Sequence, residues 1–207
     1  MPRSRRSMGR GHKPRRVNTQ EPLPRFLIIC EGERTEPAYF AGFRVPSVKI
    51  KIVGAGKDPL TLVQRAVQLR QKDDYDQVWC VFDRDDVSPE RFEQALSLAK
   101  QHGVEVACSN QAFEVWYLLH FYYFDTPFTR DDYLSRLNQQ LGRPYKKADT
   151  TLYQELLPRQ EDALQNATRL ESQYEPRNLA RDDPATTVHK LVRELNRFTQ
   201  DQRFHAS

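Results

Sequence analysis

Two stretches decide the fold: FLIICE at residues 26–31 and VWCVFDRDD at residues 78–86. Each begins with a short apolar run, which is typical of a strand buried on both faces of a sheet. Each run also ends on carboxylates. Because open α/β sheets keep their sites at the carboxyl ends of the strands, we expect these acids to meet at one edge of a sheet. The acids are Glu31, Asp83, Asp85 and Asp86.

The pattern around these two stretches alternates strands with helices. Further strands are predicted at 48–52 and 104–108, and helices at 36–43, 58–72 and 88–103. Asp58-Pro59 and Ser88-Pro89 each place a capping side chain before a proline at the first helical position. Such βαβ units form parallel sheets with right-handed crossovers.

The second half of the sequence is predicted to be helical. An aromatic-rich helix is expected at 112–123, followed by helices near 129–142, 160–175 and 184–200, the last opened by Asp183-Pro184. We therefore predict an α/β fold with a four-stranded parallel sheet over residues 24–124 and an α-helical extension over residues 125–207. Residues 1–23 are predicted to form a basic, flexible tail.

Charge is concentrated in that tail. The chain carries net +4 and its first sixteen residues carry +7, so the remainder carries −3. Such an arm is either a solvated tail or a docking element for nucleic acid phosphates. The basic residues are Arg3, Arg5, Arg6, Arg10, Lys13, Arg15 and Arg16.

The composition also bounds the cellular context. No apolar run approaches the ~18 residues of a membrane span, and the basic start lacks the apolar core of a signal peptide. The three cysteines show no metal-ligand spacing and are expected to be buried hydrophobes in a reducing compartment. We expect a cytoplasmic protein without membrane partners.

The acids at the strand ends predict a metal site. Crowded carboxylates repel one another, and Mg²⁺ or Mn²⁺ shared with substrate phosphates would relieve that repulsion. Asp83 and Asp85, two residues apart, could approach one ion, and Glu31 could be a ligand or the acid/base. The alternative is that these acids only cap helices, although together with Glu33 they make five strand-end acids, which exceed what capping needs.

Several other residues are accessory candidates. Glu36 could join the site or simply favour the start of its helix. Glu114 interrupts an apolar run, where a carboxylate is costly unless it is paired, so it either belongs to the site or forms an ion pair with an arginine. Lys146 and Lys147 could contact phosphate or form a solvated basic pair. His120 and His189 are expected to be ordinary core or surface histidines.

Nucleotide-binding loops are not predicted. Residues 54–58, GAGKD, lack the frame that cradles nucleotide phosphates, and no Gly-x-Gly-x-x-Gly occurs.

Glu31 after the first strand and Asp83-x-Asp85 after the third resemble the Toprim domain, the metal-binding module of topoisomerases, bacterial primases and overcoming-lysogenization-defect (OLD) nucleases. More specifically, the chain resembles the RloB family over residues ~25–198. The motifs that carry this resemblance are CEGERTEPAYF at 30–40, FDRD at 82–85, SNQAFEVWYLLHF at 109–121, YKK at 145–147, NA at 166–167 and PATTVH at 184–189. The sequence departs from the family at Gln111-Ala112, where a proline is expected after Asn110.

The resemblance implies a metal-dependent nuclease of anti-phage defence or abortive infection, with Glu31, Asp83 and Asp85 at the metal. It also implies a separately encoded ABC- or OLD-type ATPase partner. The substrate would be nucleic acid, either DNA or an RNA such as tRNA. Two alternatives stay open: a non-catalytic sensor subunit that binds metal and nucleic acid, and a purely structural regulator of an ATPase.

Overall fold

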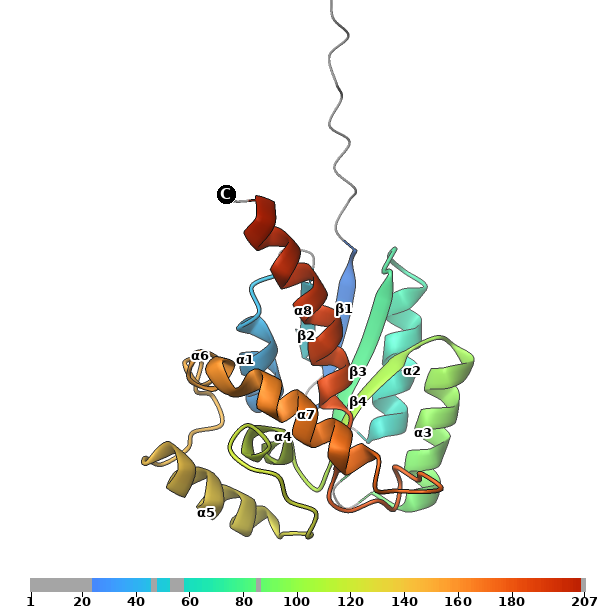
Figure 1. Cartoon of the computed structure of the whole chain (residues 1–207). Helices are drawn as coiled ribbons and strands as arrows, with labels where there is room; N and C mark the ends of the chain where they lie inside the picture. Colours follow the sequence, from blue (N-terminus) through green and yellow to red (C-terminus); the bar gives the residue numbers. More distant parts are fainter. Residues whose placement is uncertain (1–23, 46–47, 53–57, 85–86, 206–207) are drawn as a thin grey trace, which may run out of the picture.

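A five-stranded sheet forms the centre of the computed structural model, which describes residues 24–45, 48–52, 58–84 and 87–205 (Figure 1). The strand order is β2-β1-β3-β4-β5; the first four strands are parallel, and β5 pairs antiparallel with β4. The strands are β1 Phe26–Cys30, β2 Val48–Ile52, β3 Gln77–Asp83, β4 Glu105–Asn110 and β5 Ala185–Thr186.

Helices cover both faces of this sheet. α2 and α3 lie on one face, and α1, α4, α7 and α8 lie on the other (Figure 1). The helices are α1 Thr35–Ala41, α2 Pro59–Arg70, α3 Pro89–Gln101, α4 Glu114–Leu118, α5 Arg130–Leu141, α6 Leu152–Leu156, α7 Gln160–Glu171 and α8 Val188–His205, with a 3₁₀ turn at Leu157–Arg159.

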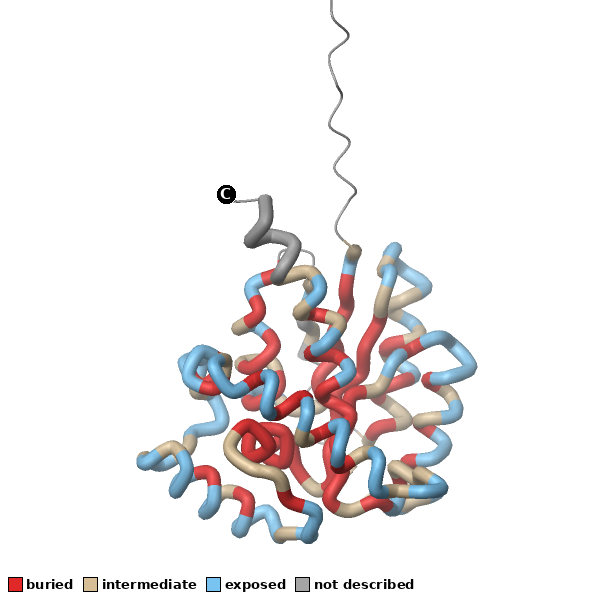
Figure 2. Tube along the Cα trace, viewed as in Figure 1, coloured by how far each residue is buried: buried red, intermediate tan, exposed pale blue. Residues whose placement is uncertain are grey.

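The central strands are buried on both faces (Figure 2). Alternate residues of a strand point to opposite faces, so Ile28 packs toward α1, α4 and α8 while Ile29 packs toward α2 and α3. This explains why β1 and β3 are continuous apolar runs.

The local helix signals are confirmed. The Asp58 side chain accepts hydrogen bonds from the backbone N–H groups of Leu60 and Thr61, at 3.1 and 3.4 Å. Ser88 accepts one from the Arg91 N–H at 3.3 Å. These side chains satisfy donors that the first turn of a helix leaves unpaired.

The prediction for Asp183-Pro184 is wrong. These residues precede β5, and α8 begins at Val188. Pairing with β4 outweighs the local helix signal, because Thr187 Oγ1 accepts a hydrogen bond from the Cys108 N–H at 2.9 Å and the Thr187 N–H donates to the Cys108 carbonyl at 2.8 Å. The four predicted parallel strands are present, and β5 adds a fifth, antiparallel strand.

The helix predicted over 112–123 is wrong in length, because α4 ends at Leu118. The Leu119 carbonyl accepts a hydrogen bond from Asn166 Nδ2 of α7 at 2.8 Å, so a tertiary contact satisfies a group that a longer helix would have paired internally. The helix α6 was not predicted.

Residues beyond 124 share one hydrophobic core with the parallel strands. That core joins β1 and α1 to buried side chains of α5, α6, α7 and α8, such as Tyr133, Leu156, Leu164 and Leu191. The division into two domains stays a prediction. Within the described ranges, no helix combines the length and apolar character needed to cross a membrane.

Candidate metal and phosphate site

Adjacent central strands bring the first two predicted acids together. The Glu31 N–H donates to the Val81 carbonyl at 2.9 Å, which continues the β1–β3 ladder one residue past β1. The Asp83 N–H then donates to Glu31 Oε2 at 3.3 Å. Glu31 and Asp83 therefore lie side by side at the carboxyl edge of the sheet, as expected from the sequence.

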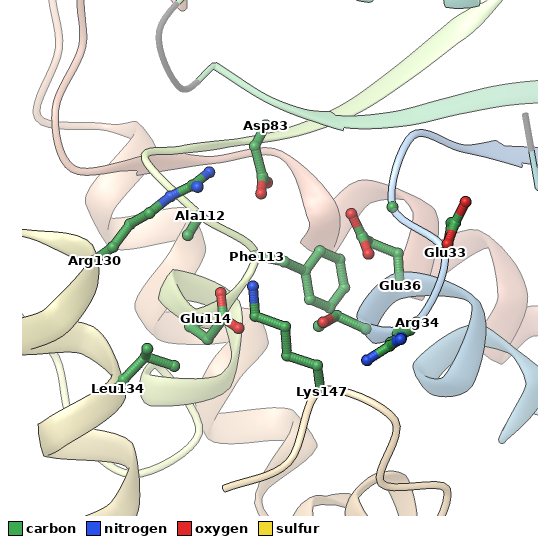
Figure 3. A pocket seen from close by; sticks show the side chains of 12 residues that line it. Glu33, Arg34, Glu36, Asp83, Ala112, Phe113, Glu114, Arg130, Leu134 and Lys147 are labelled. Carbon is green, nitrogen blue, oxygen red and sulfur yellow. The ribbon is translucent and has the colours of Figure 1, made fainter. Parts of the chain in front are cut away.

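A pocket of about 370 Å³ opens beside Asp83 (Figure 3). It is bounded by the turn after β1 and the start of α1, by the start of α4, and by residues of α5 and the α5–α6 loop. Its lining residues are Gly32, Glu33, Arg34, Thr35, Glu36, Asp83, Ala112, Phe113, Glu114, Arg130, Leu134 and Lys147.

Two of the other acids that line the pocket are buried. Glu36, in the first turn of α1, and Glu114, the first residue of α4, are each only 5 % exposed. Glu114 Oε1 is buried and has no hydrogen-bond partner among the described residues. No arginine or lysine of those residues lies within 4 Å of the Glu114 carboxylate, so the predicted alternative of an ion pair with an arginine is not observed there.

The acids perturb one another. Burial raises the pKa of Asp83 well above its usual range, and the charges of Glu36 and Glu114 raise it further, whereas Arg130 lowers it. Burial likewise raises the pKa of Glu36, with repulsion from Glu114 adding to it and Lys147 opposing it. A group that brought positive charge among these carboxylates would relieve this repulsion.

Three cationic residues line the pocket, Arg34 in the turn after β1 and Arg130 and Lys147 beyond residue 124. Arg130 begins α5 and Lys147 lies in the α5–α6 loop, and both residues are exposed. The Arg130 guanidinium points toward Asp83, and the Lys147 ammonium points into the pocket beside Glu114 (Figure 3). Arg130 was not predicted, because only the packing of α5 relates it to the strand ends.

The remaining candidates lie elsewhere. Lys146, although adjacent to Lys147, lines a separate surface depression with Arg143 and Glu155. Asp85, Asp86 and the basic residues of the tail lie outside the described residues.

The site offers oxygen donors that could hold a divalent ion. Carboxylates are the ligands that Mg²⁺ and Mn²⁺ prefer, and the unpaired buried oxygen of Glu114 is a further available donor. Within the described ranges, no three His, Cys, Asp or Glu side chains form a group that could hold a metal ion. Asp85, the third predicted ligand, lies outside those ranges.

Both histidines are core residues, as the sequence predicts. Burial lowers the pKa of His120 to about 4, and His189, which contacts Glu171 Oε2 at 2.9 Å, has a pKa lowered by burial to about 3. The three cysteines are buried and free. None of these five residues lines the acidic pocket.

Comparison with known proteins places the chain in a family. No curated protein and no solved structure matches it. The family model described as RloB-like protein matches residues 26–195, which is most of the chain. This protein therefore belongs to the RloB-like family.

Proposed function

We propose that this protein is a Mg²⁺- or Mn²⁺-dependent nuclease with a Toprim-like core, which cleaves phosphodiester bonds of nucleic acid in anti-phage defence. The observation that carries the proposal is the contact between Glu31 and Asp83 at the ends of adjacent parallel strands, beside a pocket lined by Glu36 and Glu114. Four acids in one place exceed what helix capping requires, and their mutual repulsion favours binding of a cation.

In this proposal Glu31, Asp83 and Asp85 hold the metal. A bound divalent ion would supply Lewis-acid polarisation of the phosphate and a hydroxide nucleophile. Glu31 serves either as a ligand or as the acid/base, since its carboxylate accepts from the Asp83 backbone and lies at the same edge of the sheet. Glu36 and Glu114 line the pocket as accessory acids.

The partners are also proposals. The tail, with its seven basic residues, would add contacts to DNA or RNA phosphates. A separately encoded ABC- or OLD-type ATPase would gate the activity, because an ungated nuclease would harm its host and no nucleotide-binding loop is found in the sequence.

A second candidate is a sensor subunit that binds metal and nucleic acid without cleaving. The observation that favours it is that the described lining of the pocket contains no histidine to serve as a general base. In that case the protein binds its ligands and a partner performs the chemistry.

The deciding experiment combines cleavage with thermal unfolding. The purified protein is incubated with plasmid, single-stranded DNA and total tRNA in Mg²⁺, Mn²⁺ or EDTA. At a metal concentration one hundred times the Kd, binding should add about 2.7 kcal/mol and raise the Tm by roughly 5–10 °C. Asp83→Asn should abolish both cleavage and this shift, while leaving the metal-free protein at least as stable, because one repelling charge is removed.

Asp74→Asn is the matched control. Asp74 is exposed in the loop before β3, at the end of that strand opposite Asp83. This variant should retain the metal response and the cleavage. If neither metal changes the Tm of the wild-type protein, the metal site is excluded. If metal raises the Tm but no cleavage occurs, the sensor function is favoured.

A further inference from the structure

The pocket combines acids of the α/β region with two cations from the segment beyond residue 124. Asp83 ends β3, Glu36 and Glu114 lie in the helices after β1 and β4, and Arg130 and Lys147 belong to the later segment. Glu36 and Glu114 are buried and Asp83 is half-buried, whereas Arg130 and Lys147 are exposed. A ligand that passes Arg130 and Lys147 therefore meets their positive charge before it reaches the buried carboxylates of Glu36 and Glu114.

The loop that carries Lys147 is anchored at several points. Arg143 forms ion pairs with Asp149 at 2.8 Å and with Glu155 of α6 at 2.5 Å. The Tyr145 N–H donates to Asn138 Oδ1 of α5 at 2.6 Å, and its hydroxyl donates to Thr35 Oγ1 of α1 at 3.4 Å.

The Tyr145 ring completes this anchoring by packing edge-to-face on Tyr117 of α4, with centroids 5.9 Å apart. The loop is thus fixed to four helices, α1, α4, α5 and α6, and Lys147 projects from an anchored base. A preorganised cation loses less entropy on binding an anion than one on a free arm.

Among the described residues, the charge of Lys147 has no carboxylate as a close partner. No carboxylate of the described residues lies within 4 Å of its ammonium, although its field acts on Glu36. A phosphodiester approaching Asp83 would be repelled by the acids unless a cation lay on its other side. Lys147 and Arg130 occupy that side, and lysine and arginine are the side chains that bind phosphate oxygens.

We propose that Lys147, together with Arg130, binds a backbone phosphate of the nucleic acid at the pocket mouth and orients it toward Asp83. This inference rests on the proposed nuclease function and assigns its substrate-binding residues. It also makes the segment beyond residue 124 part of the site. Lys147 would be a catalytic residue, since it touches the substrate, and Tyr145 a positioning residue that acts through the loop.

The test measures binding and cleavage separately. Anisotropy of fluorescein-labelled single-stranded DNA and of labelled tRNA is followed against salt in Ca²⁺, and cleavage is followed in Mg²⁺ or Mn²⁺. Lys147→Gln should reduce the slope of log K against log salt by about 0.7–0.9, the value of one neutralised phosphate. The kcat should fall about 10²-fold, the decrease typical of removing one oriented charge-stabilising group.

Lys146→Gln is the matched control, because it removes the same charge from the adjacent residue, which lines the other depression. It should leave the slope of log K against log salt and the kcat near their wild-type values. Lys147→Arg, which keeps the positive charge, should have a slope closer to that of the wild type than to that of Lys147→Gln. Equal effects of the two glutamine variants, or an unchanged slope in Lys147→Gln, would overturn the inference.

The two proposals fail in distinguishable ways. If the wild type cleaves and Lys147→Gln behaves as wild type, only this inference is wrong. If the wild type binds the labelled nucleic acids but cleaves neither, the nuclease proposal fails and the salt slopes alone decide the role of Lys147. If it binds neither probe, both are overturned.

Discussion

Glu36 carries a carboxyl group whose ionisation the folded protein disfavours. Burial is the principal cause, and repulsion from Glu114 adds to it, so the folded-state pKa lies above the ordinary value of about 4.3. Between these two pKa values, the folded protein binds more protons than the unfolded chain. The free energy of unfolding therefore falls as pH rises through that window. The loss of stability that comes from ionising Glu36 is complete above the folded-state pKa.

The expected consequence is a pH-dependent gain from Glu36→Gln. In EDTA, urea unfolding should show the variant to be more stable than wild type near pH 8, with this pH-dependent difference vanishing about one unit below the unfolded-state pKa, at pH ~3, where the wild-type carboxyl is protonated in both states. Glu93→Gln, an exposed site on α3, is the control and should give a pH-independent offset. If the free energies of unfolding of wild type and Glu36→Gln differed by the same amount at every pH, the expectation would be contradicted.

At the scale of elements, β5 is the shortest strand described, and a side chain just after it adds two hydrogen bonds to β4. Thr187, which follows β5, accepts from the Cys108 N–H at 2.9 Å and donates to the Val106 carbonyl at 3.1 Å. These bonds tie the start of α8 to β4, and β5 covers the edge that β4 would otherwise expose.

Thr187→Val should lower the free energy of unfolding by about 1–3 kcal/mol, because the isosteric side chain leaves the buried Cys108 N–H without its acceptor. Thr187→Ser keeps the hydroxyl and should recover most of that stability. Both are measured by urea unfolding. A valine variant as stable as wild type would show that backbone pairing alone holds β5.

At the scale of the whole molecule, the parallel strands and the segment beyond residue 124 stabilise each other. Side chains such as Tyr133, Leu156, Leu191 and Leu195 are 0–1 % exposed and share one core with Phe26 and Ile28. Removing each large apolar side chain from such a core costs about 2–5 kcal/mol, and a domain has only about 5–15 kcal/mol in total.

A fragment ending at residue 124 should consequently fail to fold cooperatively. Near-ultraviolet circular dichroism and urea titration of this fragment should show no sigmoidal transition. A cooperative transition with native-like aromatic ellipticity would contradict this and would support residues 24–124 as an autonomous domain.

Deletion of residues 2–16 should leave the free energy of unfolding unchanged, because we expect this segment to bury no core. It should weaken nucleic acid binding and flatten the salt dependence, by about 0.7–0.9 in the slope for each phosphate that the tail neutralises. An unchanged slope in the anisotropy titration would remove the tail from the proposed interface.

Local sequence signals were enough to predict those helices and strands whose formation depends on their own residues. The apolar runs of β1 and β3 predict buried parallel strands, and Asp58 and Ser88 mark helix starts by capping groups within three residues of themselves. Glu114 could be identified as a candidate from the sequence, because burying a carboxylate within an apolar run is costly unless it is paired.

Features that depend on residues far apart in the sequence were decided only by the tertiary structure. β5 is too short to show a strand period and exists through pairing with β4, while α4 ends where Asn166 of α7 satisfies the Leu119 carbonyl. Arg130 and Lys147 reach the acidic pocket because α5 and its loop pack against α1 and α4. No local pattern encodes such contacts, since they depend on the summed packing of residues far apart in the sequence.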